Sequence, residues 1–236
     1  MVIPFSRLAS GTKVLLFGPQ ALAFNQESFE QLRSTLLGSP DFRWALDAVA
    51  ELPGYWSMLS KSVSRLQNIP GAELLQNLSY WLSTGKTTQD SFPLPNILLT
   101  PLVVITHLTQ YSRLLELAKL VSKEPQNLHA SFTQNAETAG ICTGLLSALA
   151  VSSSASQAEL QHYGPVAIRL AMLVGAIVDS RDTLTEVQEH SVSLSVAWSS
   201  PESGTEVAEI LKSFPEAGLL SWQTRPEHLF TDWCNL

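Results

Sequence analysis

The sequence predicts an α/β protein in which helices cover a sheet that carries the functional residues. Three observations predict this class. They are a short apolar run at Lys13–Phe17, a Gly-x-Cys-x-Gly turn at residues 140–144 that opens an apolar helix, and long stretches with helical periodicity. Strands of parallel sheets are buried on both faces, so they read as continuous apolar runs like Lys13–Phe17.

Composition excludes several classes of protein. The 236 residues are 45% hydrophobic and 15% charged, enough for one large domain with a sizeable core. A net charge of −7 argues against a nucleic-acid partner. Two cysteines, Cys142 and Cys234, make neither a disulfide framework nor a metal-ligand spacing. We therefore expect a cytoplasmic protein with no metal, no signal peptide and no membrane span.

The first predicted strand runs into a loop that contains a candidate binding residue. Gly18, Pro19 and Gln20 follow Phe17 directly, so Gln20 lies just past the carboxyl end of the strand. Ligand groups of α/β proteins are placed at that edge of the sheet. Gln20 is accordingly a candidate binding residue, and the alternative is an ordinary loop glutamine.

The remaining pattern is mainly helical. Residues 27–82 predict several helices, with breaks at Pro53-Gly54 and at Ile69–Gly71, and residues 96–120 predict a long, largely buried helix. A further helix is predicted at 157–178, a strand at 192–198 and a helix at 201–214, whereas residues 126–139 show only a weak strand. Asp179 and Asp182 are interpreted as a solvated helix end.

Two polar residues lie inside the apolar helices. His107 is expected to be a satisfied core residue or to line a pocket, rather than to bind a ligand. Arg169 is the single charge within its apolar run, and a buried, unpaired guanidinium is costly. Arg169 must therefore either reach the surface or meet a hydrogen-bond acceptor.

The turn at Gly140–Gly144 has the form of a nucleophile elbow with Cys142 in place of serine. Glycines two residues before and two after let the chain turn sharply, so that the sulfur projects above the sheet. The positive end of the following helix favours a thiolate, and the amide of Thr143 would donate to an oxyanion. The alternative is a buried cysteine between two glycines that pack helices.

Four stretches carry a resemblance to a known family: Val14–Gln20, Pro93–Leu102, Gly140–Ala148 and Ala167–Ala171. With the 192–198 strand, they resemble the starter-unit acyltransferase domain of fungal non-reducing polyketide synthases, over about residues 10–216. The resemblance implies a malonyl-transacylase-like fold. Its parts would be an α/β-hydrolase-like large subdomain at 1–190, the start of a ferredoxin-like small subdomain at 191–217, and a divergent tail at 218–236.

The resemblance also implies an activity. The family takes an acyl group from acyl-CoA or an acyl carrier protein onto a cysteine, and passes it to the carrier protein of the synthase. The acyl thioester is the substrate, and no bound cofactor is implied. By resemblance, Cys142 is the nucleophile, Gln20 joins Thr143 in the oxyanion hole, and Arg169 falls near the residue that holds the substrate carboxylate in malonyl-specific relatives.

One feature of the family is not matched. Its general base is a histidine downstream of the small subdomain, but His228 lies in Arg225–Leu229, which does not match that context. The small subdomain reads as incomplete, which suggests a truncated domain that acquires an acyl group slowly. Three hypotheses follow: an acyltransferase, an impaired remnant that at most binds a carrier protein or synthase, and a cysteine-dependent thioesterase.

Overall fold

The computed structural model describes residues 13–19, 26–86, 94–121 and 128–182, together with Thr205, Glu206 and Glu209. The chain divides into two compact units, Met1–Glu189 and His190–Leu236. In the second unit, Thr205, Glu206 and Glu209 are helical, as predicted for the 201–214 segment. The predicted strand at 192–198 and the tail at 218–236 lie outside the described residues.

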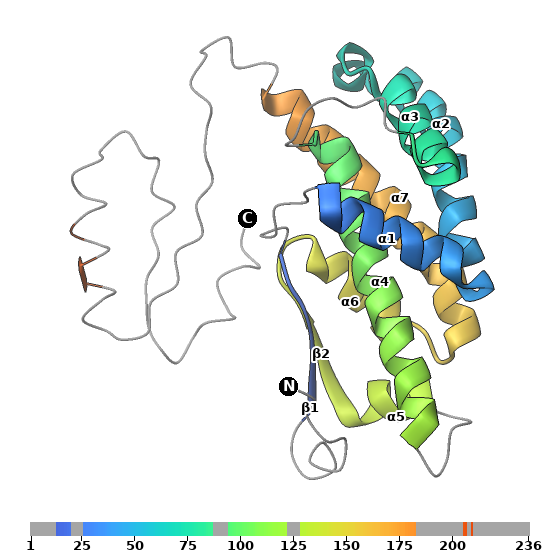
Figure 1. Cartoon of the computed structure of the whole chain (residues 1–236). Coiled ribbons are helices and arrows are strands. Elements are labelled where there is room, and N and C mark those ends of the chain that lie inside the picture. Colours follow the sequence, from blue (N-terminus) through green and yellow to red (C-terminus); the bar gives the residue numbers. More distant parts are fainter. Residues whose placement is uncertain are drawn as a thin grey trace. The chain divides into compact units, whose positions relative to one another are not determined.

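The first unit contains two strands and a larger set of helices among its described residues (Figure 1). In chain order the elements are β1 (Lys13–Phe17), α1 (Gln26–Gly38), η2 (Pro40–Phe42), α2 (Arg43–Ser62), η3 (Ser64–Asn68), α3 (Gly71–Thr84), α4 (Asn96–Val121), α5 (Leu128–Asn135), β2 (Ala136–Gly140), α6 (Gly144–Ser152) and α7 (Gln157–Asp182). This is the predicted α/β class, with a small parallel sheet.

The two strands pair in parallel, and their carboxyl ends are aligned. Phe17 is the register partner of Gly140, so the chain leaves both strands at the same edge of the sheet. The faces of β1 differ, because Phe17 is buried whereas Val14 and Leu16 are 56% and 59% exposed. The prediction of a strand buried on both faces is therefore wrong for one face of β1 in the described structure.

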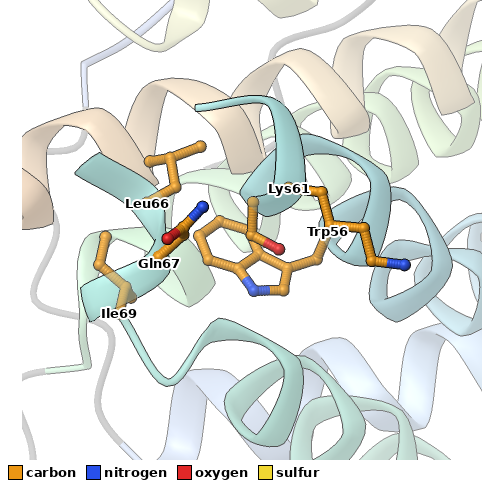
Figure 2. Close-up of a pocket in the computed structure, with 6 residues that line it drawn as sticks. Trp56, Lys61, Leu66, Gln67 and Ile69 are labelled. Atoms are coloured by element: carbon orange, nitrogen blue, oxygen red, sulfur yellow. The ribbon is translucent and has the colours of Figure 1, made fainter. Parts of the chain in front are cut away.

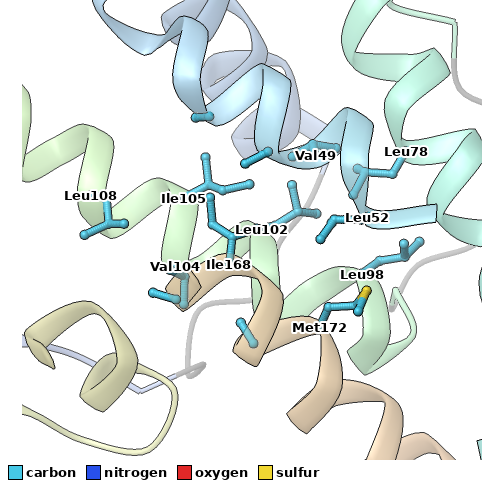
Figure 3. Packing of buried hydrophobic residues seen from close by; sticks show 14 of the residues in the cluster. Val49, Leu52, Leu78, Leu98, Leu102, Val104, Ile105, Leu108, Ile168 and Met172 are labelled. Atoms are coloured by element: carbon cyan, nitrogen blue, oxygen red, sulfur yellow. The ribbon is translucent and has the colours of Figure 1, made fainter. Parts of the chain in front are cut away.

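The core of this unit lies where α4 and α7 pack along each other (Figure 1). Helix α2 packs on α7, and buried side chains from the three helices interdigitate, among them Val49, Leu52, Leu102, Ile105, Ile168 and Met172 (Figure 3). Helix α4 is buried on most sides, as its apolar sequence predicts. Among the described residues, Gln157–Ser180 of α7 is long and apolar enough to cross a membrane, but it packs against α2, α4 and α6.

Two helical segments differ from the prediction. Helix α2 continues through Pro53, where the sequence predicts a break. Leu52 and Trp56 are both buried, so tertiary packing on either side of the proline offsets the lost hydrogen bond. Helix α5 lies in the polar stretch before β2, where no helix is predicted, because its residues show little amphipathic pattern.

Asp179 does not belong to a solvated helix end, contrary to prediction. Its carboxylate accepts hydrogen bonds from the backbone amides of Asn96 and Ile97, at 3.0 and 2.8 Å, and from the side chain of Asn96 at 2.9 Å. These amides are the first of α4 and have no partner within their own helix. Asp179 therefore caps α4 from the far end of α7, a contact between residues 82 and 83 positions apart that sequence spacing cannot reveal.

Candidate active site

Cys142 lies at the turn between β2 and α6, as the nucleophile-elbow interpretation predicts. Among the described residues other than glycine, it alone has a positive φ, of 54°. This conformation crowds Cβ and costs about 1–2 kcal/mol for an L-residue. Such strain persists where the surrounding structure imposes it, and it is common at active sites.

Main-chain hydrogen bonds impose the turn. The amide of Ile141 donates to the carbonyl of Phe17 at 3.0 Å, which ties the turn to the end of β1. The amide of Gly144 donates to Ile141, and that of Leu145 donates to Cys142, each at 3.0 Å. The reversal of the chain is thus fixed on both sides of the cysteine.

The two glycines leave no room for a side chain. A Cβ at Gly140 would lie 2.4 Å from the carbonyl oxygen of Gly144, and a Cβ at Gly144 would lie 2.2 Å from that of Phe17. Both obstacles are main chain, which cannot swing aside as a flexible side chain can. The glycines are therefore required by the close approach of β1, β2 and α6, and not by helix packing alone.

Cys142 directly precedes the N-terminus of a helix. Helix α6 begins at Gly144, and Thr143 is its buried N-cap residue. Cys142 is exposed, and its Sγ lies 3.9 Å from the hydroxyl of Thr143. The alternative of a cysteine buried between packing glycines is therefore wrong.

A polar contact lies behind the elbow. His107 of α4 and Ser147 of α6 are joined by a hydrogen bond of 3.1 Å between Nδ1 and Oγ. The imidazole also meets the ring of Phe17 edge-on, with 5.7 Å between centroids. Burial lowers the pKa of His107, because desolvation disfavours the charged ring. His107 is thus a satisfied residue at the junction of β1, α4 and α6, as predicted.

His129 is buried, and it anchors α5, the helix that leads into β2. Nε2 of His129 lies 2.8 Å from the carbonyl of Ser154, so this nitrogen carries the proton and donates it. Nδ1 then accepts from the hydroxyl of Tyr111 at 3.1 Å. Burial raises the pKa of that hydroxyl. No local pattern in the sequence indicates this cluster, because its members are distant in the chain.

Arg169 meets an acceptor rather than extending into solvent. Its Nε donates to the carbonyl of Pro165 at 3.2 Å, and its Nη1 donates to the hydroxyl of Tyr55. The guanidinium also lies over the ring of Tyr55, 4.5 Å from its centroid. These contacts tie Arg169 to α2. Gln20, the remaining residue of the predicted site, lies outside the described residues. So does His228, which is not assigned to the site.

A pocket of about 220 Å³ is found elsewhere in the described structure (Figure 2). Its walls come from α2, η3 and the residue after η3, and they are formed by Trp56, Ser60, Lys61, Leu66, Gln67 and Ile69. This volume is below that of most small-molecule sites. None of its residues belongs to the elbow, so the pocket does not identify the acyl site. The described residues also contain no group of three or more His, Cys, Asp or Glu side chains arranged to hold a metal ion.

Comparison with known proteins identifies the family. Residues 56–226 match the family described as starter unit:ACP transacylase in aflatoxin biosynthesis. The non-reducing polyketide synthase pigA of Monascus ruber is 48% identical over 222 residues, which cover 94% of this chain. Clavatol synthase claF of Penicillium crustosum is 46% identical over 205 residues, and the citrinin polyketide synthase of Monascus ruber is 43% identical over 206.

Each of these matches covers 8% of the length of the relative, so the chain corresponds to one part of a much larger synthase. The region that matches the family covers most of the chain, and it includes the Cys142 elbow, α6 and α7. The resemblance noted in the sequence is confirmed at the level of the family. This chain belongs to the family of starter unit:ACP transacylases found in fungal non-reducing polyketide synthases.

Proposed function

We propose that this chain is a starter-unit acyltransferase that carries an acyl group on Cys142 during polyketide biosynthesis. The observation that carries the proposal is the positive φ of Cys142 between two glycines that admit no Cβ. A buried structural cysteine needs neither the strain nor the exposure. Both are what a nucleophile requires when it must project from a strand-to-helix turn.

The chemistry is a thioester exchange in two steps. The thiolate of Cys142 attacks the carbonyl carbon of an acyl-CoA or acyl carrier thioester, and the tetrahedral intermediate expels the donor thiolate, which takes up a proton. The phosphopantetheine thiol of the acceptor carrier then loses its proton and attacks the acyl-Cys142 thioester. Cys142 leaves as the thiolate, so the protein is unchanged at the end of the cycle.

The negative oxygen of each intermediate needs donors. We assign the amide of Thr143, at the start of α6, as one donor, and the side chain of Gln20 as the second. The position of Thr143 at the N-cap supports its assignment, because the helix N-terminus also favours negative charge. Gln20 follows β1, whose end is tied to the elbow through the carbonyl of Phe17.

Arg169 is proposed to shape the acyl site. Its guanidinium is already engaged by Tyr55 and by the carbonyl of Pro165, so part of its donor capacity is used within the protein. An arginine so engaged is less able to bind a substrate carboxylate. We therefore expect starter groups without a carboxylate to be transferred in preference to malonyl.

The test is acyl loading of the purified chain. Incubation with a series of straight-chain acyl-CoA thioesters, followed by intact-mass analysis, should show one acyl group per chain, and Cys142→Ala should abolish it. Cys234→Ala is the matched control and should load like the original chain. His228→Ala should also leave loading unchanged, because its sequence context does not match the family histidine.

Two other outcomes identify the competing hypotheses. If no thioester loads any variant, the chain is an impaired domain that at most binds a carrier protein or synthase. If free acid is released in a Cys142-dependent manner without transfer to a carrier, the activity is that of a thioesterase. Transfer from loaded Cys142 to a phosphopantetheinylated carrier domain of a related synthase would support the full proposal.

A further inference from the structure

The strained backbone at Cys142 raises the question of what holds it in place. The hydrogen bonds of the turn join it to the end of β1 and to the start of α6, but none of those described reaches α4. A strained conformation is retained only when its neighbours leave no lower-energy alternative. Three elements, β1, α4 and α6, meet behind the cysteine and can supply such a constraint.

His107 and Ser147 are the polar contact at that junction. Ser147 lies one helical turn and a residue beyond Cys142, on the face of α6 that is fully buried. Its hydroxyl meets Nδ1 of His107 at 3.1 Å. The same imidazole packs edge-on against Phe17, whose carbonyl accepts from the amide of Ile141 in the turn.

These contacts form a closed path through the site. The path runs from the turn to the end of β1, through the ring of Phe17 to His107 on α4, and through Ser147 back to the first turns of α6. A hydroxyl buried in an otherwise apolar contact is costly unless it is paired, so the orientation in which Ser147 meets His107 is favoured over others.

We propose that the His107–Ser147 pair is a positioning device that fixes α6 against α4 and β1, and so holds Cys142 in its strained, reactive conformation. Neither residue acts on the acyl group. The proposal deepens the proposed function, since it rests on Cys142 being the reacting thiol. It predicts that loss of the pair relaxes the turn and reduces the reactivity of the sulfur, rather than only reducing stability.

The experiment measures the rate of alkylation of Cys142 by iodoacetamide, in the full chain with Cys234→Ser as background. Ser147→Ala should lower the rate constant about three- to tenfold, because a small displacement of a reacting group has a large kinetic effect. His107→Leu should do the same, whereas His107→Asn should restore most of the rate, because its amide can occupy the position of Nδ1.

Tyr111→Phe is the matched control. It removes one buried hydrogen bond from the same helix, the bond to His129, and keeps the ring that faces Phe17. Its alkylation rate should stay within about twofold of the original, even where its unfolding midpoint falls as far as that of Ser147→Ala. The comparison of rate against stability separates a positioning role from a structural one.

The outcomes decide between these roles. If Ser147→Ala is alkylated as fast as the Tyr111→Phe control, or faster than the original chain, the proposal is overturned. If His107→Leu does not fold, the smaller change Ser147→Ala still gives the answer. An original chain that is alkylated but never loaded by acyl-CoA would contradict the proposed function, and the comparison of alkylation rates would still test the positioning role.

Discussion

The elbow and the helical core achieve rigidity in different ways. Around Cys142, the main chain carries the contacts: amide-to-carbonyl hydrogen bonds join the turn to β1, and the glycines lie against carbonyl oxygens. In the core of α2, α4 and α7, side chains carry them, with buried aliphatic groups from each helix in contact (Figure 3). The elbow therefore tolerates no added atom at its glycines, whereas the core depends on the identity of its side chains.

The difference reflects what each region must do. A packed core is stable in any arrangement that buries apolar surface well, so substitutions there are graded in their effect. A nucleophile must be held in one strained conformation, and close main-chain contacts leave few alternatives. Substitutions in the two regions test this contrast.

The largest effect is expected at Gly144. Gly144→Ala places a Cβ 2.2 Å from the carbonyl oxygen of Phe17 and 2.5 Å from that of Gly18, and should destabilise the fold by about 3 kcal/mol. Urea unfolding measures the loss. Gly54→Ala, in α2 with nothing within 4 Å of the new Cβ, is the control and should gain about 0.5–1 kcal/mol. Equal effects at both glycines would remove the contrast between the regions.

A smaller loss is expected at the cap between α7 and α4. Asp179→Ala removes the acceptor of three hydrogen bonds at the start of α4, and should cost about 2 kcal/mol of unfolding free energy. Asp47→Ala breaks an exposed ion pair with Arg43 and should cost less than about 0.5 kcal/mol. Chemical denaturation of both variants checks the ranking, and a cost at Asp179 no greater than at Asp47 would show that the cap contributes little.

The smallest expected effect is a gain. Cys142→Gly removes the Cβ that is strained at a φ of 54°, whereas Cys142→Ala retains it, so the glycine variant should be more stable than the alanine variant by about 1 kcal/mol. Thermal unfolding of the two variants measures the difference. Both variants lack the thiol and should not be loaded. If the alanine variant proves the more stable, the backbone at residue 142 is not strained.

Much of this protein is determined by local sequence. Short sequence patterns predict the Gly140–Gly144 turn, the strand β1 and the long helices α4 and α7. In each of them the constraint lies between neighbouring residues: a glycine without Cβ, an apolar strand, or a helical repeat. The same turn with its flanking residues, together with three supporting stretches, indicates the family.

Tertiary structure decided the rest, because the relevant contacts join residues far apart in the chain. Pro53 stays inside α2 because buried neighbours on both sides hold the helix together. Asp179 caps a helix that begins 83 residues earlier in the chain. Arg169 donates a hydrogen bond to Tyr55, which is 114 residues away in the sequence. The partner of His107 is 40 residues away on α6. A local pattern fixes where a side chain can point, but only the packing of the helices determines what it meets there.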